Sequence, residues 1–145
     1  MPGDLRLKRQ VCFALYSATR AVTNYYRPLL EPLGLTYPQY LVMLVLWEHG
    51  ECTVKDLGTQ LMLDSGTLSP LLKRLETAGL LSRRRDPADE RSVIVRLTDR
   101  GENLRHQATD VPINIAAASG LPPSELAQLR DTLAALTQSM LRSTR

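Results

Sequence analysis

Residues 53–79, TVKDLGTQLMLDSGTLSPLLKRLETAG, decide the fold of this 145-residue chain. Their leucines recur at the three- and four-residue steps of two short helices, and the segment MLDSG separates the two patterns as a turn. Thr53 is placed to cap the first helix, and Pro70 is compatible with the second only if that helix begins near residues 65–67. Two short helices joined by a tight turn form the helix-turn-helix pattern.

The sequence period changes directly after Gly79. Residues 80–85, LLSRRR, and residues 92–97, SVIVRL, are short strand candidates, and the second is rich in β-branched side chains. The intervening residues 86–90, DPADE, are typical of a turn. A β-hairpin at this place turns the helix-turn-helix pattern into a winged helix.

Two helical patterns precede this region. Residues 7–30 carry a stripe of apolar side chains at helical spacing, and Pro28 should kink or end that helix. Residues 36–49 form a mostly apolar helix, which Thr36 and Gln39 open with a capping box. The apolar composition of this second helix places it in the core.

Two further helices follow the hairpin. Thr98 is placed to cap a helix that runs from residue 99 towards Ala118, and the segment SGLPP interrupts it. Residues 124–141 form a last amphipathic helix. We therefore predict a mainly α fold with a small β-hairpin: a winged helix-turn-helix with additional helices at both ends, in one domain over residues 1–145.

Composition excludes several classes of protein. The net charge of +3 is a mild indication of a polyanionic partner. No apolar signal segment opens the chain and its longest apolar run is far too short to span a bilayer, so we expect a cytoplasmic protein without a membrane partner. Two cysteines forty residues apart and two isolated histidines indicate no disulfide framework, no metal site and no cofactor.

Small polar and basic residues gather where a winged helix contacts DNA. Ser65, Thr67 and Ser69 lie at the N-terminal end of the second short helix, the end that a recognition helix presents to the major groove. Each hydroxyl also has the alternative of only capping the helix. Basic residues follow on the helix and the hairpin, where they are placed to reach phosphates, guanine edges or the minor groove: Lys73, Arg74, Arg83, Arg84, Arg85 and Arg91.

The hairpin segment DERSVIVRLTDRG resembles the wing of the MarR family, which are dimeric winged-helix repressors. The family's wing pattern is an Asp, an Arg two residues later, then Leu-Thr and a Gly, and it is matched here by Asp89, Arg91, Leu97, Thr98 and Gly101. The resemblance implies that Arg91 enters the minor groove and Asp89 orients it. It also implies a homodimer on double-stranded operator DNA, with the winged helix at about 36–98 and dimerisation helices at about 1–35 and 99–145.

Two further segments, CFALYSATRA and YYRPLLEPLGLTYPQYLVMLVLWE, are similar to the OhrR group of organic hydroperoxide sensors within that family. In that group an N-terminal cysteine senses the peroxide, and tyrosines donate hydrogen bonds to its thiolate. The resemblance implies that Cys12 is the redox-sensing residue and that Tyr26 and Tyr37 are its partners, with Tyr16 as a further pocket residue.

The chemistry of Cys12 can be considered without the family. A thiol reacts with peroxide as its thiolate, which nearby cations and hydroxyl donors stabilise, and Lys8 and Arg9 lie one turn before Cys12. Tyr26 follows fourteen residues later, about 21 Å away along a straight helix. If both serve one site, Tyr26 must come from a second subunit. The alternative is that Cys12 is only a small packing residue.

Cys52 lies in the link before the helix-turn-helix, and no cysteine follows it. The chain therefore resembles the one-cysteine type of sensor, in which a low-molecular-weight thiol caps the oxidised cysteine or over-oxidation follows. We expect Cys52 to be structural.

These observations predict a repressor, not an enzyme, that leaves its operator when an organic hydroperoxide oxidises Cys12. One alternative is a MarR-type repressor that a small phenolic ligand releases without covalent chemistry. A thiol peroxidase is disfavoured because the chain lacks a strand-rich thioredoxin-like pattern, and a DNA-compacting protein is disfavoured by the modest charge.

Overall fold

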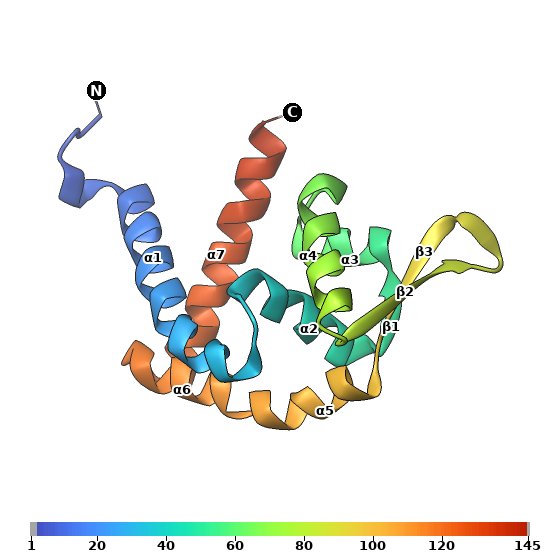
Figure 1. Ribbon diagram of the computed structural model, residues 1–145. Helices are drawn as coiled ribbons and strands as arrows, with labels where there is room; N and C mark the ends of the chain where they lie inside the picture. The colour runs from blue at the N-terminus through green and yellow to red at the C-terminus, as the bar shows by residue number, and fades with distance from the viewer. Residues whose placement is uncertain (1–2, 145) are drawn as a thin grey trace. The chain divides into compact units, whose positions relative to one another are not determined.

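The computed structural model describes residues 3–144 and divides the chain into two compact units, Met1–Thr109 and Asp110–Arg145. Figure 1 shows the elements of both units. The first unit contains η1 (Leu7–Arg9), α1 (Val11–Leu30), η2 (Glu31–Leu33), α2 (Tyr37–His49), β1 (Glu51–Thr53), α3 (Val54–Leu61), α4 (Ser65–Thr77), β2 (Leu81–Asp86), β3 (Asp89–Leu97) and α5 (Asp99–Ala108). The second unit contains α6 (Asp110–Ser119) and α7 (Pro123–Ser143).

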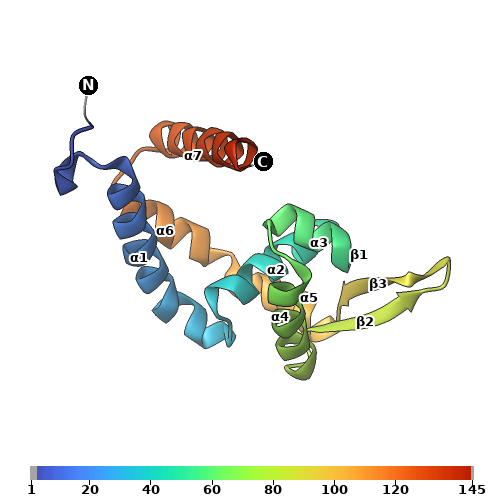
Figure 2. The same ribbon diagram turned by 90° about the horizontal axis from the view of Figure 1, so that it is seen from above.

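The predicted mainly α fold with a winged helix-turn-helix is confirmed. Helices α3 and α4 are the two short helices, and the β2–β3 hairpin extends beyond them as the wing, as Figure 2 shows from above. The Thr53 hydroxyl accepts a hydrogen bond from the Asp56 N–H at 3.1 Å, and α4 begins at Ser65 as Pro70 requires. The core of the unit consists of fully buried side chains: Leu30, Val42, Met43, Leu46, Leu57, Leu68, Leu72, Leu75, Leu81 and Val95.

Both predicted caps at the edges of the winged helix are present. Thr36 and Gln39 form the capping box of α2, each side chain bonding the backbone N–H of the other residue. The Thr98 hydroxyl accepts from the Gly101 N–H at 3.1 Å at the start of α5. Local sequence signals therefore placed these helix starts correctly.

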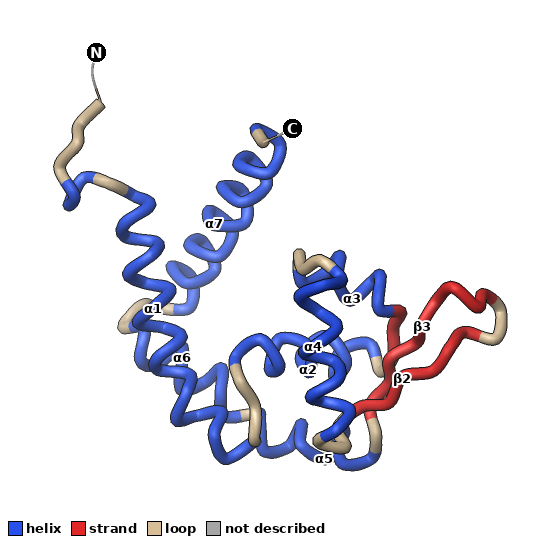
Figure 3. The backbone as a smooth tube through the Cα atoms, turned by 45° about the horizontal axis from the view of Figure 1, so that its top comes forward, coloured by secondary structure: helices blue, strands red, loops and turns tan. Residues whose placement is uncertain are grey.

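The sheet has three antiparallel strands in the order β1-β3-β2, one more than the predicted hairpin (Figure 3). The additional strand β1 pairs Cys52 with Val95 of β3, and its three residues are too few to show an alternating pattern. The hairpin turn is also tighter than predicted. Strand pairing extends to Asp86 and Asp89, because the Asp86 carboxylate accepts the Ala88 N–H at 2.9 Å and closes the turn.

The prediction of one helix from residue 99 towards Ala118 is wrong in one respect. The structure divides this segment into α5 and α6 at Thr109. Pro112 explains the division. It has no N–H for the carbonyl of Ala108, four residues earlier, and its ring would clash with that carbonyl in a continuous helix. The break expected in the SGLPP segment, residues 119–123, is present at residues 120–122, between α6 and α7.

Helices α1 and α7 bury little within their own units. Leu30 is the one buried residue of α1, and none of the residues of α7 that the structure describes is buried. Several large apolar side chains on these helices are at least 40% exposed, a sign of surfaces that bind other molecules: Val11, Phe13, Tyr16, Val22, Tyr25, Leu129, Met140 and Leu141.

No single helix within residues 3–144 is long and apolar enough to cross a membrane. The α1–η2 segment and α2, bent by 66°, pass that test together on length and composition alone.

Candidate functional site

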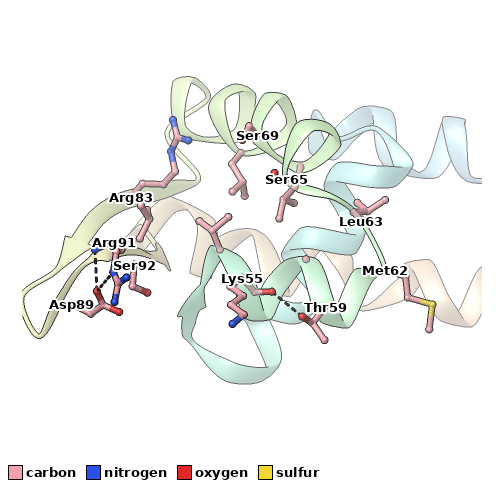
Figure 4. A pocket seen from close by; sticks show the side chains of 15 residues that line it. Lys55, Thr59, Met62, Leu63, Ser65, Ser69, Arg83, Asp89, Arg91 and Ser92 are labelled. Carbon is pink, nitrogen blue, oxygen red and sulfur yellow. Dashed lines mark hydrogen bonds and ion pairs between the residues drawn. The ribbon is translucent and has the colours of Figure 1, made fainter. Parts of the chain in front are cut away.

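A hollow of about 930 Å³ lies between α3, α4 and the wing. Figure 4 shows Ser65 and Ser69 of α4 on one side of it, Lys55 and Thr59 of α3 on another, and Asp89 and Arg91 of the wing at its end. Polar and basic side chains from three elements thus converge on one concave face, an arrangement that suits a polyanion with many hydrogen-bond acceptors.

The predicted residues of α4 are all exposed: Ser65, Thr67, Ser69, Lys73 and Arg74. The cap of this helix is Asp64, which sequence reasoning did not name. Its carboxylate accepts the Thr67 N–H at 2.8 Å. Since Asp64 caps α4, the hydroxyls of Ser65 and Ser69 are not required for capping and line the hollow instead.

The two wing residues of the MarR pattern lie together. Asp89 Oδ1 accepts the backbone N–H of Arg91 at 3.1 Å and lies 3.7 Å from its Nε. The Arg91 side chain is 96% exposed, so the guanidinium remains available to an external partner. Arg84 is also exposed. Its Nη2 lies 4.0 Å from Oε2 of Glu51 in β1, which is a long ion pair.

Arg83 differs from Arg84 and Arg85 because it is only partly exposed and pairs with the recognition helix. Its backbone N–H and its Nη2 each donate to the Glu76 carboxylate at 3.1 Å, and these bonds lower the pKa of Glu76. Glu76 belongs to α4 and Arg83 to β2, so the pair joins the recognition helix to the wing. Arg85 donates to the Glu90 carbonyl at 2.6 Å across the hairpin.

Sequence reasoning also missed the contribution of α3. Lys55 and Thr59 line the hollow, and the Thr59 hydroxyl donates to the Lys55 carbonyl at 3.1 Å. Their spacing of four residues places them on one face of the helix, a signal that the sequence contains. In a helix-turn-helix the first helix crosses the DNA backbone, so Lys55 is suited to a phosphate contact.

A second cluster consists of aromatic side chains at the junction of α1 and α2. The ring centres of Tyr26 and Tyr37 lie 4.6 Å apart, and that of Tyr40 lies 5.8 Å from Tyr26 and 6.3 Å from Tyr37. Burial raises the pKa of all three phenols, that of Tyr26 to about 12 with a contribution from the other two tyrosines. Tyr40 was not predicted, although it follows Tyr37 by one helical turn.

A cavity of about 380 Å³ adjoins the tyrosine cluster, which is defined here as Tyr26, Tyr37 and Tyr40. Its lining includes Arg27 and Glu31 of the α1 and η2 segment together with apolar Leu30 and Leu35. The cavity therefore combines an apolar wall with one cation, Arg27, and one carboxylate, Glu31.

Cys12 lies in the first turn of α1 and is exposed, as is Tyr16, whose ring lies 5.6 Å below the guanidinium carbon of Arg20. The helix is continuous from Val11 to Leu30, so Cys12 and Tyr26 are about 21 Å apart along it. The structure thus brings Tyr26 and Tyr37 together but leaves Cys12 at the other end of the helix.

Cys52 has a contrasting environment in strand β1. Burial, and secondly the charge of Asp56, raise the pKa of its thiol and disfavour the reactive thiolate. Among residues 3–144, no group of three His, Cys, Asp or Glu side chains is placed to hold a metal ion.

Known proteins share this arrangement of elements. The family described as transcriptional regulator SarA/Rot matches residues 24–107. An organic hydroperoxide resistance transcriptional regulator of Bacillus subtilis (strain 168) is 47% identical over 136 residues, 94% of this chain and 92% of the relative. The chain belongs to the MarR/SarA family of winged-helix transcriptional regulators.

Two solved structures are similar to this MarR/SarA regulator in fold and sequence. The structure of reduced AbfR of Staphylococcus epidermidis bound to DNA matches this chain with a TM-score of 0.82 and 34% sequence identity. The match covers 97% of this chain and 96% of AbfR. BpsR of Bordetella bronchiseptica, whose DNA binding is regulated by 6-hydroxynicotinic acid, has a TM-score of 0.79 and 27% identity, covering 89% of this chain and 99% of BpsR.

These similarities confirm the resemblance to the MarR family and to its organic hydroperoxide regulators. The relatives and the similar structures are transcriptional regulators rather than enzymes, and this chain is a DNA-binding regulator of the same type.

Proposed function

We propose that this MarR/SarA regulator is a cytoplasmic repressor that binds double-stranded operator DNA as a homodimer and leaves it when an organic hydroperoxide oxidises Cys12. The observation that carries the proposal is the separation of two halves of one site along α1. Cys12 is exposed at one end of the helix, and Tyr26 and Tyr37 are packed together at the other.

A two-fold dimer joins these halves. An antiparallel pairing of α1 with its copy brings Cys12 of one protomer to Tyr26 and Tyr37 of the other, and the same contact then occurs twice. The exposed apolar side chains Val11, Phe13 and Val22 of α1 supply the surface for such a pairing. Because burial raises the pKa of Tyr26 and Tyr37, their hydroxyls stay protonated and can donate to a thiolate.

The oxidation step is a two-electron transfer. The Cys12 thiolate attacks the outer peroxide oxygen, the O–O bond breaks, and the other oxygen leaves as an alkoxide that takes a proton from water to become the alcohol. The sulfur becomes a sulfenic acid, which a low-molecular-weight thiol converts to a mixed disulfide with release of water. Cys12 then no longer carries the negative charge that the tyrosine hydroxyls stabilised, and the attached thiol enlarges its side chain at the dimer interface. Both changes alter the spacing of the two recognition helices.

The DNA contacts follow from the hollow and the wing. Ser65, Thr67 and Ser69 at the start of α4 meet base edges in the major groove, and Lys73 and Arg74 meet phosphates. Arg84 and Arg91 of the wing enter the minor groove, with Asp89 orienting Arg91. A dimer must place both recognition helices in successive major grooves, so a small change of spacing is enough for release.

The test is release from the DNA upstream of the regulator's own gene at fixed salt. We expect cumene hydroperoxide with a small thiol to release wild-type protein and Cys52→Ser, while Cys12→Ser stays bound. Continued binding of oxidised wild-type protein would contradict the proposal, and so would release of Cys12→Ser.

A second candidate function is release by a small phenolic acid without covalent chemistry. The observation that favours it is the cavity of about 380 Å³ beside Tyr26 and Tyr37, which Arg27 lines. BpsR, a structural relative, is regulated in its DNA binding by 6-hydroxynicotinic acid, a hydroxypyridine carboxylic acid, and NadR, another, is solved in complex with the phenolic acid 4-hydroxyphenylacetate. Release of both wild-type protein and Cys12→Ser by 4-hydroxyphenylacetate would favour this alternative.

A further inference from the structure

The tyrosine cluster continues into the core through a chain of aromatic contacts. Tyr40 is 3% exposed, and its ring centre lies 6.3 Å from that of Trp47 in an edge-to-face arrangement. Tyr37, Tyr40 and Trp47 all belong to α2 at spacings of three and seven residues, so they lie on one side of that helix.

Trp47 connects this chain to a different part of the unit. Its indole Nε1–H donates to the Gly101 carbonyl at 2.9 Å, and the side chain is 7% exposed. Gly101 lies in the first turn of α5, fifty-four residues farther along the chain. The bond is thus a buried polar link between α2 and α5 in a core that is mostly apolar.

The first turn of α5 holds the end of the recognition helix. The Thr98 hydroxyl donates to the Gly79 carbonyl at 2.6 Å, and Arg100 Nη1 donates to the Ala78 carbonyl at 3.0 Å. Gly101 approaches Leu80 so closely that a Cβ at this position would overlap the Leu80 carbonyl oxygen. The end of α4 and the start of the wing are therefore held directly against the first turn of α5 at Gly101.

We propose that Trp47 is a positioning residue that transmits the arrangement of the tyrosine cluster to the recognition helix and wing through its hydrogen bond to Gly101. The inference rests on the proposed function for its signal, since oxidation of Cys12 is what disturbs the tyrosines. A close-packed core deforms little, so a shift of the Tyr37 and Tyr40 rings displaces the indole rather than being absorbed. Because the indole is bonded to the Gly101 carbonyl, its displacement shifts the first turn of α5, which contacts the end of α4.

The alternative is that the bond only satisfies a buried indole N–H. Trp47→Phe separates the two, because it keeps a buried ring and removes the donor. Val45→Ala is the matched control, since it also weakens the core of α2 but lies on another face, two residues before Trp47. A purely structural role lowers the melting temperature of both variants and leaves the response to oxidation unchanged.

The first measurement is the ratio of operator dissociation constants for oxidised and reduced protein. We expect Trp47→Phe to reduce this ratio by about three- to tenfold, the factor that corresponds to the net contribution of one hydrogen bond. Val45→Ala keeps the wild-type ratio. The chain has one tryptophan, so the emission of wild-type protein reports on Trp47 directly and should shift on oxidation but not in Cys12→Ser.

A double-mutant cycle on reduced protein tests the transmission without any oxidation. We expect Tyr37→Ala to weaken operator binding at least about threefold more in the wild-type background than in the Trp47→Phe background. The reason is that Trp47→Phe has already lost the hydrogen bond to Gly101. Equal factors in the two backgrounds, including no effect in either, would overturn the proposal. If wild-type protein stays on DNA after oxidation while the cycle shows this coupling, the proposed function fails and the transmission through Trp47 stands.

Discussion

Helices α4 and α1 are both amphipathic, but they use their apolar faces differently. Helix α4 buries Leu68, Leu71, Leu72 and Leu75 against its own chain, whereas α1 buries only Leu30 and exposes apolar residues along its length. The difference teaches that one chain is sufficient to define the DNA-binding face, whereas the proposed sensor needs a second chain to complete it.

The largest effect is expected in α4. Leu72→Ala removes a fully buried side chain, and we expect it to lower the free energy of unfolding by about 2–5 kcal/mol. Lys73→Ala, on the exposed side of the same helix, should change it by less than about 0.5 kcal/mol. Urea denaturation followed by circular dichroism gives both values, and equal effects would show that α4 is not anchored in this core.

The corresponding test of α1 is the association of two chains. Val22→Asp places a carboxylate on the exposed apolar face, and we expect the dimer dissociation constant to rise at least about tenfold while the helix content is retained. Thr77→Asp, exposed at the end of α4, is the control for added charge. Sedimentation equilibrium measures both. An unchanged dimer for Val22→Asp would remove α1 from the proposed interface.

Within the wing, the contrast is between an arginine directed outward and one bonded inward. Arg91→Ala should reduce the slope of log Kd against log salt concentration by about one per protomer, because a DNA-contacting cation is lost. Arg83→Ala should leave the slope unchanged and lower stability by about 0.5–1 kcal/mol through loss of its pair with the partly exposed Glu76. Anisotropy titrations at several salt concentrations distinguish the two, and a reduced slope for Arg83→Ala would place Arg83 on DNA.

The smallest effect concerns the alkaline behaviour of Tyr26. Its pKa is about 12 in the folded chain against 10.0 for a free tyrosine, so between these values the unfolded chain binds fewer protons than the folded one. Stability should therefore fall as pH rises from 10 to 12, with about 1 kcal/mol of the loss due to this half-buried phenol. Tyr26→Phe should flatten that part of the profile. A titration of tyrosinate absorbance that Tyr26→Phe leaves unchanged would contradict the assignment.

The sequence by itself determined the elements that local interactions specify. Thr36, Thr53 and Thr98 cap helices through bonds to residues three positions away, and the leucines of α4 follow one helical period. The order of helices and hairpin, and the placing of arginines on the wing, follow from such short-range signals, and so does the resemblance to the MarR family.

Tertiary packing decided the remaining contacts. Strand β1 exists because Cys52 pairs with Val95, and Trp47 reaches Gly101 across more than fifty residues. The tyrosine cluster combines Tyr26 of α1 with two residues of α2. No local periodicity encodes such pairs, because they depend on how separate elements fill a shared core, where each side chain's position is set by the volumes of all its neighbours.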